Sequence, residues 1–408
     1  MSNNPNRKQT VAVIFGSRSV EHDVSVVTAQ QVIRALDPNK YEVLPIYITR
    51  DGKWLTGPLL TDIKTFQNDN LEELMGIKET IIPPSTGYKG VITPPVAGYL
   101  ARNVLKKIDV AFPVVHGTHG EDGTLQGVFE MADVPYVGCG VLASAVANDK
   151  ITTKAILKEA GIPVVDYVSF RRYDWTRDRE KWIERLEELG YPMFIKPASL
   201  GSSIGIGRPA DRQMLGASVD VAVNMDRRVL AERAVVGAME INCSVMGNNE
   251  VRASVLERPV SFEDFLSYEE KYMRGGANKG MKGADRVIPA PLSPEMTAYI
   301  RQMTIDAFKA IDGRGIARID YLVKDDQVFL NEINTLPGSL SLYLWAETPE
   351  YPMSPAMVVD ELIRLAHEAH AEKKRTMYNY KSGLISQAAA RGLKGTKGMK
   401  GLKGGIKR

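Results

Sequence analysis

The sequence is poor in cysteine and has no long hydrophobic run, and both absences exclude classes of protein. Only Cys139 and Cys243 occur among 408 residues, far apart and without metal-ligand spacing, so neither a disulfide framework nor a cysteine metal site is expected. No apolar run approaches the roughly 18 residues that span a bilayer, which excludes an integral membrane protein. The N-terminus also lacks the apolar core of a secretory signal, so we expect a cytoplasmic protein.

A large net charge is also absent, because 52 Lys and Arg nearly balance 49 Asp and Glu. The balance conceals an asymmetry, since residues 371–408 hold 11 Lys and Arg and one acid, while the rest of the chain is mildly acidic. Between 393 and 404 a unit of Leu, Thr or Met followed by Lys-Gly repeats, and glycine together with like charges predicts a disordered tail. We expect such a tail to contact polyanions or anionic membrane surfaces.

The body of the chain alternates between strand-like and helix-like segments, which indicates a mixture of α/β and α+β structure. A Rossmann-like parallel sheet is predicted at the N-terminus, from strands at 11–15, 41–48 and 109–115 and an amphipathic helix at 24–36. Later helices are expected at 144–160, 178–189, 295–311 and 355–370, and later strands at 192–196, 228–232, 240–246, 250–257, 315–323 and 327–334.

A glycine-rich segment, 196–207 (KPASLGSSIGIG), follows one of these strands. Small residues let a backbone approach phosphate oxygens, which its N–H groups can then bind. The segment is not a Walker loop, because no Gly-Lys-Ser/Thr ends it. Taken alone, it is equally compatible with a flexible surface hairpin.

Two short polar motifs on neighbouring strands, 318–320 (RID) and 332–334 (EIN), give a sharper signal. Residues two apart share one face of a strand, and an odd loop between the strands brings both pairs to the same face. A three-residue loop at 324–326 would set Arg318 opposite Glu332. Oxygen ligands converging beside a guanidinium suit Mg²⁺ bound to nucleotide phosphates. The alternative is the solvated polar face of an edge hairpin.

Two further polar segments lie where predicted strands give way to helices, 21–23 (EHD) and 116–123 (HGTHGEDG). Parallel α/β sheets bind ligands at this edge, so both are candidate site loops. Each is also compatible with a structural role, because acids complement a helix dipole and a lone histidine is more often structural. Lys271-Tyr272 lies in a loop-like segment and by itself indicates no function.

Taken in order, the motifs resemble those of the D-alanine–D-alanine ligase family of the ATP-grasp superfamily. Each motif is modest alone, but eight in the family's order, between about residues 11 and 368, are highly specific. They are 19–25 (SVEHDVS), 116–127 (HGTHGEDGTLQG), 135–138 (PYVG), 148–150 (NDK), 196–205 (KPASLGSSIG), 269–272 (EEKY), 318–320 (RID) and 331–338 (NEINTLPG).

The resemblance implies a fold and a domain organisation. A Rossmann-like N-terminal domain (1–145) would be followed by the two lobes of an ATP-grasp fold (146–238 and 239–370) and by the basic tail (371–408). ATP would lie between the lobes, and the amino-acid substrates would lie beside the N-terminal domain. The family also implies a homodimer.

The resemblance further implies roles for individual residues. ATP would be bound through its phosphates, its adenine and its ribose by Lys150, Lys196, Ser202, Ser203, Glu232, Ala234, Val235, Glu240 and Lys271. Mg²⁺, or Mn²⁺ in its place, would be held by Asp320, Glu332 and Asn334. Glu21 would anchor the ammonium of the first D-alanine, with His116 nearby, and Ser202 would link Glu21 to Tyr272 of a closing loop. Arg318 and the Gly338 backbone would stabilise the oxyanion, and Ser339 is a candidate for the second substrate's carboxylate.

The implied chemistry fits these residue types. The first D-alanine carboxylate would take the γ-phosphoryl group of ATP, and the amine of the second D-alanine would attack the acyl phosphate. Lysines and Mg²⁺ would neutralise phosphate charge, so catalysis would consist mainly of positioning and electrostatics. A closing loop would protect the acyl phosphate from water.

Four departures from the family pattern stand out. Ser17-Arg18 replaces a second glycine, and one extra residue separates Glu232 from Glu240. The stretch 337–345 (PGSLSLYLW) is shorter than usual, so Ser339 or Ser341 would have to bind the second carboxylate. The basic tail lies outside the pattern.

Three functions are compatible with these motifs. The sequence favours synthesis of D-alanyl-D-alanine for peptidoglycan precursors. A ligase that joins D-alanine to D-lactate or D-serine is the alternative, although depsipeptide-forming relatives usually replace the Lys271-Tyr272 pair. A non-catalytic nucleotide-binding scaffold is the third, and the intact set of catalytic residue types argues against it.

Overall fold

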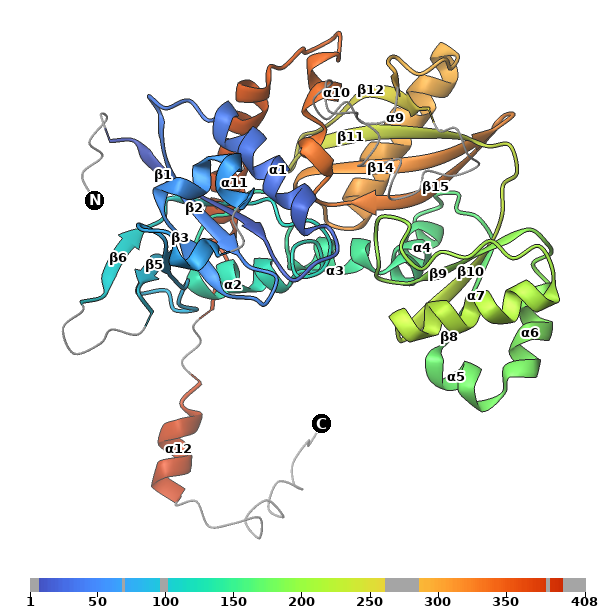
Figure 1. Cartoon of the computed structure of the whole chain (residues 1–408), viewed down its shortest axis with the longest axis horizontal. Coiled ribbons are helices and arrows are strands. Elements are labelled where there is room, and N and C mark those ends of the chain that lie inside the picture. The colour runs from blue at the N-terminus through green and yellow to red at the C-terminus, as the bar shows by residue number, and fades with distance from the viewer. Residues whose placement is uncertain (1–6, 68–69, 96–101, 261–285, 379–381, 392–408) are drawn as a thin grey trace, which may run out of the picture. The chain divides into compact units, whose positions relative to one another are not determined.

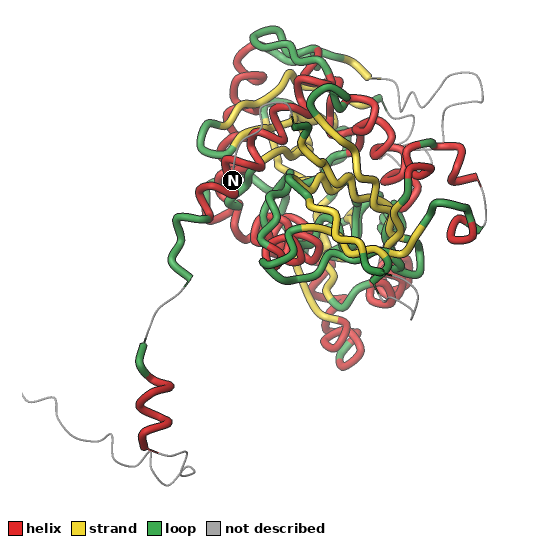
Figure 2. The backbone as a smooth tube through the Cα atoms, turned by 90° about the vertical axis from the view of Figure 1, so that its left-hand side faces the viewer, coloured by secondary structure: helices red, strands yellow, loops and turns green. Residues whose placement is uncertain are grey.

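The computed structural model describes residues 7–67, 70–95, 102–260, 286–378 and 382–391. These residues belong to two compact units, residues 1–370 and 371–408. Within the first unit the strands gather in the interior and helices flank them (Figure 2). None of the described helices combines the length and the apolarity needed to cross a bilayer.

The N-terminal part contains a five-stranded sheet in the order β4-β3-β2-β1-β7, with α1 packed against it (Figure 1). The parallel pairing of β1 with β2 and β7 confirms the predicted Rossmann-like core, whereas β3 and β4 add an antiparallel edge. A separate β5–β6 hairpin was not predicted. The elements are β1 (Gln9–Gly16), α1 (His22–Ala35), β2 (Tyr41–Ile48), β3 (Trp54–Thr56), β4 (Lys78–Glu79), β5 (Gly90–Thr93), β6 (Val104–Lys107), β7 (Val110–Pro113) and α2 (Thr124–Ala132).

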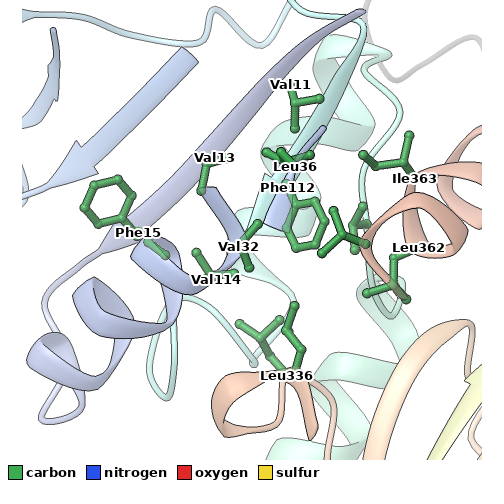
Figure 3. Close-up of a cluster of buried hydrophobic side chains, with 14 of the residues drawn as sticks. Val11, Val13, Phe15, Val32, Leu36, Phe112, Val114, Leu336, Leu362 and Ile363 are labelled. Carbon is green, nitrogen blue, oxygen red and sulfur yellow. The ribbon is translucent and has the colours of Figure 1, made fainter. Parts of the chain in front are cut away.

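A buried apolar cluster joins this sheet to the C-terminal helix of the unit (Figure 3). Val11 and Phe112 of the sheet and Val32 of α1 meet Leu362 of α11 (Pro355–Lys373), and all four are fully buried. Leu336 belongs to the same cluster, so the core holds the chain immediately before the Pro337-Gly338 loop.

The middle part is a three-stranded antiparallel sheet, β8-β10-β9, with α7 packed against β9 and β10. The single helix expected at 144–160 is wrong, because the chain forms two helices that break at Asp149. The side chain of Asp149 accepts a hydrogen bond from the Thr152 N–H and caps the second helix. The elements are α3 (Val141–Asn148), α4 (Lys150–Glu159), β8 (Tyr167–Arg171), α5 (Arg172–Arg177), α6 (Arg179–Glu187), β9 (Met193–Pro197), α7 (Arg212–Met225) and β10 (Arg228–Arg233).

The last part of the unit is a five-stranded antiparallel sheet, β13-β12-β11-β14-β15, with α9 packed on one face (Figure 1). Buried apolar residues of β11, β14 and β15 meet Ile300 and Phe308 of α9, which leaves the other face for polar residues. The elements are β11 (Met239–Gly247), β12 (Val251–Pro259), β13 (Arg286–Val287), α9 (Pro294–Ala310), β14 (Gly315–Lys324), β15 (Gln327–Asn334) and α10 (Leu342–Ala346).

The second unit contains the helix α12 (Leu384–Arg391). Disorder was expected throughout the tail, but this segment contains helix-forming Leu, Gln and Ala residues and precedes the Lys-Gly repeat. The repeat itself, at 393–404, lies outside the described residues.

Candidate active site

A cavity of about 980 Å³ lies in the first unit, and the strands that line it all belong to the last sheet. The rest of its wall includes one side of α1, the loop after β7, the glycine-rich loop and the segment from Gly338 into α10. Eight of the residues predicted from sequence line it, namely Glu21, Lys150, Ser202, Arg318, Glu332, Asn334, Gly338 and Ser339.

The residues predicted to bind a metal lie on the β14–β15 hairpin, but the expected loop and register are wrong. The loop has two residues, Asp325 and Asp326, and Asp320 rather than Arg318 lies opposite Glu332. A β-bulge at Asn331 supplies the extra residue, so the acids share a face although the loop is even. The sequence prediction therefore reached the correct face with an incorrect turn.

The polar row continues across the sheet further than predicted. Asn242 of β11 pairs with Asp320 on one side and with Glu257 of β12 on the other. Directly opposed residues share a face, so Glu332, Asp320, Asn242 and Glu257 form one row over four strands. The Asn242 amide donates to Glu257 Oε1 at 3.0 Å.

Arg318 is fixed beside this row by Asp320. Its Nε and Nη2 donate to the two carboxylate oxygens at 2.6 and 2.7 Å, and Asn334 Nδ2 donates to Asp320 Oδ2 at 3.0 Å. Burial disfavours the charged guanidinium, but Asp320 outweighs it and raises the pKa of Arg318 well above its ordinary value. Arg318 is therefore a permanent, oriented cation at the cavity wall.

Two of the predicted nucleotide-binding residues, Lys196 on β9 and Glu232 on β10, form a buried ion triplet with Lys154 of α4. Glu232 contacts Lys154 Nζ at 2.6 Å and pairs with Lys196, and its side chain is 4% exposed. Burial opposes its ionisation, but the two ammonium groups outweigh it and lower the pKa of Glu232 to about 2. Lys196 also donates to the Asn331 side-chain oxygen at 3.3 Å, which links the middle sheet to β15.

The glycine-rich loop connects the nucleotide-binding residues to Glu21. Lys150 donates from Nζ to the Leu200 carbonyl at 2.8 Å, and Ser202 donates its hydroxyl to Glu21. Ser202 and Ser203 both have left-handed backbones, at φ +54° and +61°. Gly117 faces Glu21 from the other side, and a Cβ there would lie 2.7 Å from Glu21 Oε2, so this position requires glycine.

His116 and Glu121 lie in the same corner. Burial lowers the pKa of His116, and in its neutral form Nδ1–H donates to the Leu336 carbonyl at 2.9 Å while Nε2 accepts from Thr28. Burial and the nearby Glu21 raise the pKa of Glu121, although it accepts the Gly117 and Leu336 N–H groups at 2.8 and 2.9 Å. The raised pKa of Glu121 reflects the cost of a second buried negative charge beside Glu21, a cost that a cation bound in this corner would reduce.

The short loop after Pro337 contains three consecutive left-handed residues. Ser339, Leu340 and Ser341 have φ values of 49–50°, a conformation that residues other than glycine adopt rarely. Ser339 lines the cavity. Ser341 is fully buried, and its hydroxyl finds no hydrogen-bond partner among the residues that the structure describes. Of the two serines, Ser339 is therefore the one positioned to meet a ligand.

Other predicted residues lie elsewhere. Ala234 and Val235 follow β10 and Glu240 is the second residue of β11, and the described wall of the cavity does not include them. Lys271 and Tyr272 lie outside the described residues.

The prediction missed five residues near the cavity, namely Glu121, Lys154, Asn242, Glu257 and Arg286. Glu257 carried a usable signal, because it is a charged residue at the end of an apolar strand sequence, 251–257. Lys154 carried a similar signal, because it is a charged residue within the helix pattern predicted at 144–160. For the others, only long-range packing defines the position.

Oxygen donors suited to Mg²⁺ are present on this face. Asn334 donates from Nδ2 to Asp320, which leaves its Oδ1 to bind a metal beside the Asp320 and Glu332 carboxylates. Within the described chain, no three His, Cys, Asp or Glu side chains cluster closely enough to hold a metal by themselves. The set therefore fits an ion that is shared with phosphate oxygens.

Comparisons with known proteins agree with this arrangement. Sequence profiles described as D-ala D-ala ligase N-terminus and C-terminus match residues 10–139 and 156–364. A D-alanine–D-alanine ligase from Thermosipho africanus is 39% identical over 92% of this chain and 98% of its own length. A D-alanine–D-alanine ligase structure from Coxiella burnetii matches with a TM-score of 0.76, 28% identity and coverage of 94% and 99%. The VanG D-Ala:D-Ser ligase from Enterococcus faecalis matches with a TM-score of 0.74, 30% identity and coverage of 88% and 100%.

Proposed function

The chain belongs to the D-alanine–D-alanine ligase family, and from this premise we propose how its own residues join two D-alanines at the expense of ATP. The first D-alanine carboxylate attacks the γ-phosphorus, ADP leaves, and an acyl phosphate remains. The second D-alanine amine attacks the acyl carbon, loses a proton, and phosphate leaves as the peptide bond forms. One observation carries the proposal: Glu21, Arg318 and Glu332 line the same cavity.

The first D-alanine is held at the acidic corner. Its ammonium lies against Glu21, whose carboxylate is oriented by the Ser202 hydroxyl. Neutral His116 fixes the chain at Leu336 and adds no competing positive charge. The carboxylate of the first D-alanine then lies toward Arg318, which stabilises the oxyanion together with the Gly338 backbone.

ATP lies between the middle and last sheets, with Lys150 and Lys196 on its phosphates. We place the division between the lobes near residue 238, and the membership of β10 and β11 in different sheets supports this proposal. Ser203 and Lys271 contribute to the phosphates, Glu232, Ala234 and Val235 to the adenine, and Glu240 to the ribose.

Asp320, Glu332 and Asn334 hold the magnesium ion. When bound, Mg²⁺ neutralises the phosphate charge that builds up during transfer. Arg318 is oriented by Asp320 and, as a cation, does not bind the metal. It therefore remains available to the acyl oxygen.

The substrate choice is tested by competition. With ATP, Mg²⁺ and equal D-alanine and D-lactate at pH 7, we expect D-alanyl-D-alanine as the main product, because Lys271-Tyr272 resembles the dipeptide-forming pattern. Products are separated by mass. D-Serine in place of D-lactate tests the activity named for the VanG relative. Predominant depsipeptide or D-alanyl-D-serine would overturn the substrate assignment but leave the ATP-dependent reaction standing.

We also propose that the product supplies peptidoglycan synthesis, that the enzyme works in the cytoplasm where ATP is available, and that it is a homodimer as the family resemblance implies. The tail has a separate role in contacting polyanions or anionic membrane surfaces.

Deleting residues 376–408 tests that separation. We expect kcat and KM for D-alanine to change less than twofold, because every proposed site residue precedes residue 348. Retention on heparin or on anionic vesicles should fall in the deleted chain and, in the full chain, weaken as salt is raised. A large loss of activity at constant folded fraction would show that the tail belongs to the site.

A further inference from the structure

Arg286 is a positive charge in the cavity wall that the proposed reaction does not yet use. It begins β13 and pairs through its backbone with Pro259 at the end of β12. Its guanidinium carbon lies 4.1 Å from the ring centroid of Tyr343, and its Nη1 donates to Glu257 Oε2 at 3.4 Å. The side chain is 36% exposed, so it is oriented by its neighbours and still accessible.

The surroundings of Arg286 connect it to the reacting carbon. Tyr343 donates its hydroxyl to Glu257 at 2.6 Å, and Glu257 belongs to the polar row that passes through Asp320. Burial raises the pKa of Tyr343, and the positive charges of Arg286 and Arg318 both act on it in the opposite direction, because both guanidinium groups lie near the Tyr343 hydroxyl. Arg286 therefore belongs to the Arg318 end of the cavity.

A second D-alanine needs a cation at this end. Its amine must reach the acyl carbon beside Arg318, and its carboxylate carbon is only two bonds from that amine. The cavity wall there already contains Glu332 and Glu257, and an unpaired anion placed among carboxylates is strongly disfavoured. Arg318 makes two hydrogen bonds to Asp320, whereas the described contacts of Arg286 use one of its five N–H donors.

We propose that Arg286 binds the carboxylate of the second amino acid and so selects acceptors that carry one. This assignment rests on the proposed ligase function and adds a specificity-determining residue to it. Tyr343 packs against the guanidinium and Glu257 accepts from its Nη1, and a guanidinium held in this way can bind a carboxylate through its other N–H groups. D-Lactate also carries a carboxylate, so Arg286 does not distinguish it from D-alanine.

The test compares two acceptors that differ only in this group. Enzyme, ATP, Mg²⁺, D-alanine and an equal concentration of D-alaninamide are mixed, and the ratio of dipeptide to dipeptide amide is measured by mass. Both acceptors attack the same acyl phosphate, so the ratio does not depend on the first substrate, on ATP or on the fraction of enzyme that is folded. A purely structural role of Arg286 would leave the ratio unchanged.

We expect Arg286→Gln to shift the ratio toward the amide by roughly 10–100-fold relative to wild type, the range for loss of a charge-assisted hydrogen bond. Arg286→Lys should fall between the two, because a lysine keeps the charge but not the fork. Arg258→Gln is the matched control, since Arg258 is exposed on the adjacent strand and lies outside the described cavity wall.

Each outcome bears on one proposal. A wild-type enzyme that forms no dipeptide would contradict the ligase function itself. An active wild type whose ratio is unchanged in Arg286→Gln, or changed equally in Arg258→Gln, would overturn the role of Arg286 alone. If Arg286→Gln forms too little of either product, the ratio for Arg286→Lys decides, and a wild-type ratio there counts against the proposal.

Discussion

We expect Glu332→Gln to abolish ATP-dependent ADP release in the presence of Mg²⁺ and D-alanine while the protein remains folded. The substitution keeps the shape of the side chain but removes one of the two carboxylates, Asp320 and Glu332, that lie opposite each other in the polar row. Removal of a residue that only hydrogen-bonds to a metal ligand lowers metal affinity or activity by about 10–100-fold. Removal of the charge of a ligand itself should therefore lower activity by more than about 100-fold. Glu332 is only partly buried, and its loss removes no core packing.

The measurement is steady-state ADP formation across a range of Mg²⁺ concentrations, with the thermal midpoint recorded for each protein. Glu250→Gln is the matched control, because Glu250 is exposed in the turn between β11 and β12. Near-normal Mg²⁺-dependent turnover by Glu332→Gln would contradict the metal assignment. A low thermal midpoint would instead indicate a structural role.

The largest expected loss of stability comes from Glu232→Gln, which leaves two buried lysines without their counter-charge. Lys154 is 2% exposed and Lys196 is 11% exposed at the side chain, so neither can recover full hydration. Breaking a buried pair in this way costs about 3–5 kcal/mol. Lys154→Met should cost less, because Glu232 then keeps Lys196. Urea denaturation midpoints provide the comparison.

The control for this pair is Lys158→Met, one turn further along α4, where the lysine is exposed over the Tyr167 ring. Its loss should cost at most about 1 kcal/mol.

Acid provides a second check, because the pKa of Glu232 falls from 4.5 to about 2 on folding. Its stabilising effect is therefore complete above about pH 4.5 and is lost as the pH falls toward 2. Equal denaturation midpoints for Glu232→Gln and Lys158→Met would refute the triplet's importance.

Lys154→Met also affects ATP binding. With Lys154 absent, Glu232 has only Lys196 to neutralise it, which draws that lysine away from the phosphates. A higher KM for ATP at unchanged kcat is the expected signature.

Local sequence patterns were sufficient for most of the elements and for the shared face of Asp320 and Glu332. The strands of the first sheet follow from short apolar runs, because a buried parallel strand needs no polar face. The break at Asp149 was missed because apolar periodicity continues through it, although a capping aspartate was present in the sequence.

The spacing of apolar residues in the sequence also indicated the bulge in β15. Val328, Leu330 and Ile333 are all buried in the apolar cluster on the side of β15 that faces α3 and α4, but their spacing of two and then three cannot keep one face in a regular strand. Arg286 and Glu257 are different, because their meeting depends on the pairing of β12 with β13 and on Tyr343 from α10. No local pattern encodes that encounter.

The bulge has a consequence for how the length of this hairpin can vary among relatives. Deletion of Asn331 would straighten β15 and leave Glu332 opposite Asp320, but the contact between Asn331 and Lys196 would be lost. A gap at Ile333 would instead turn Asn334 away from Arg318 and break up the oxygen set. Deletions in this strand are therefore compatible with the same active-site face at one position and incompatible with it two residues later.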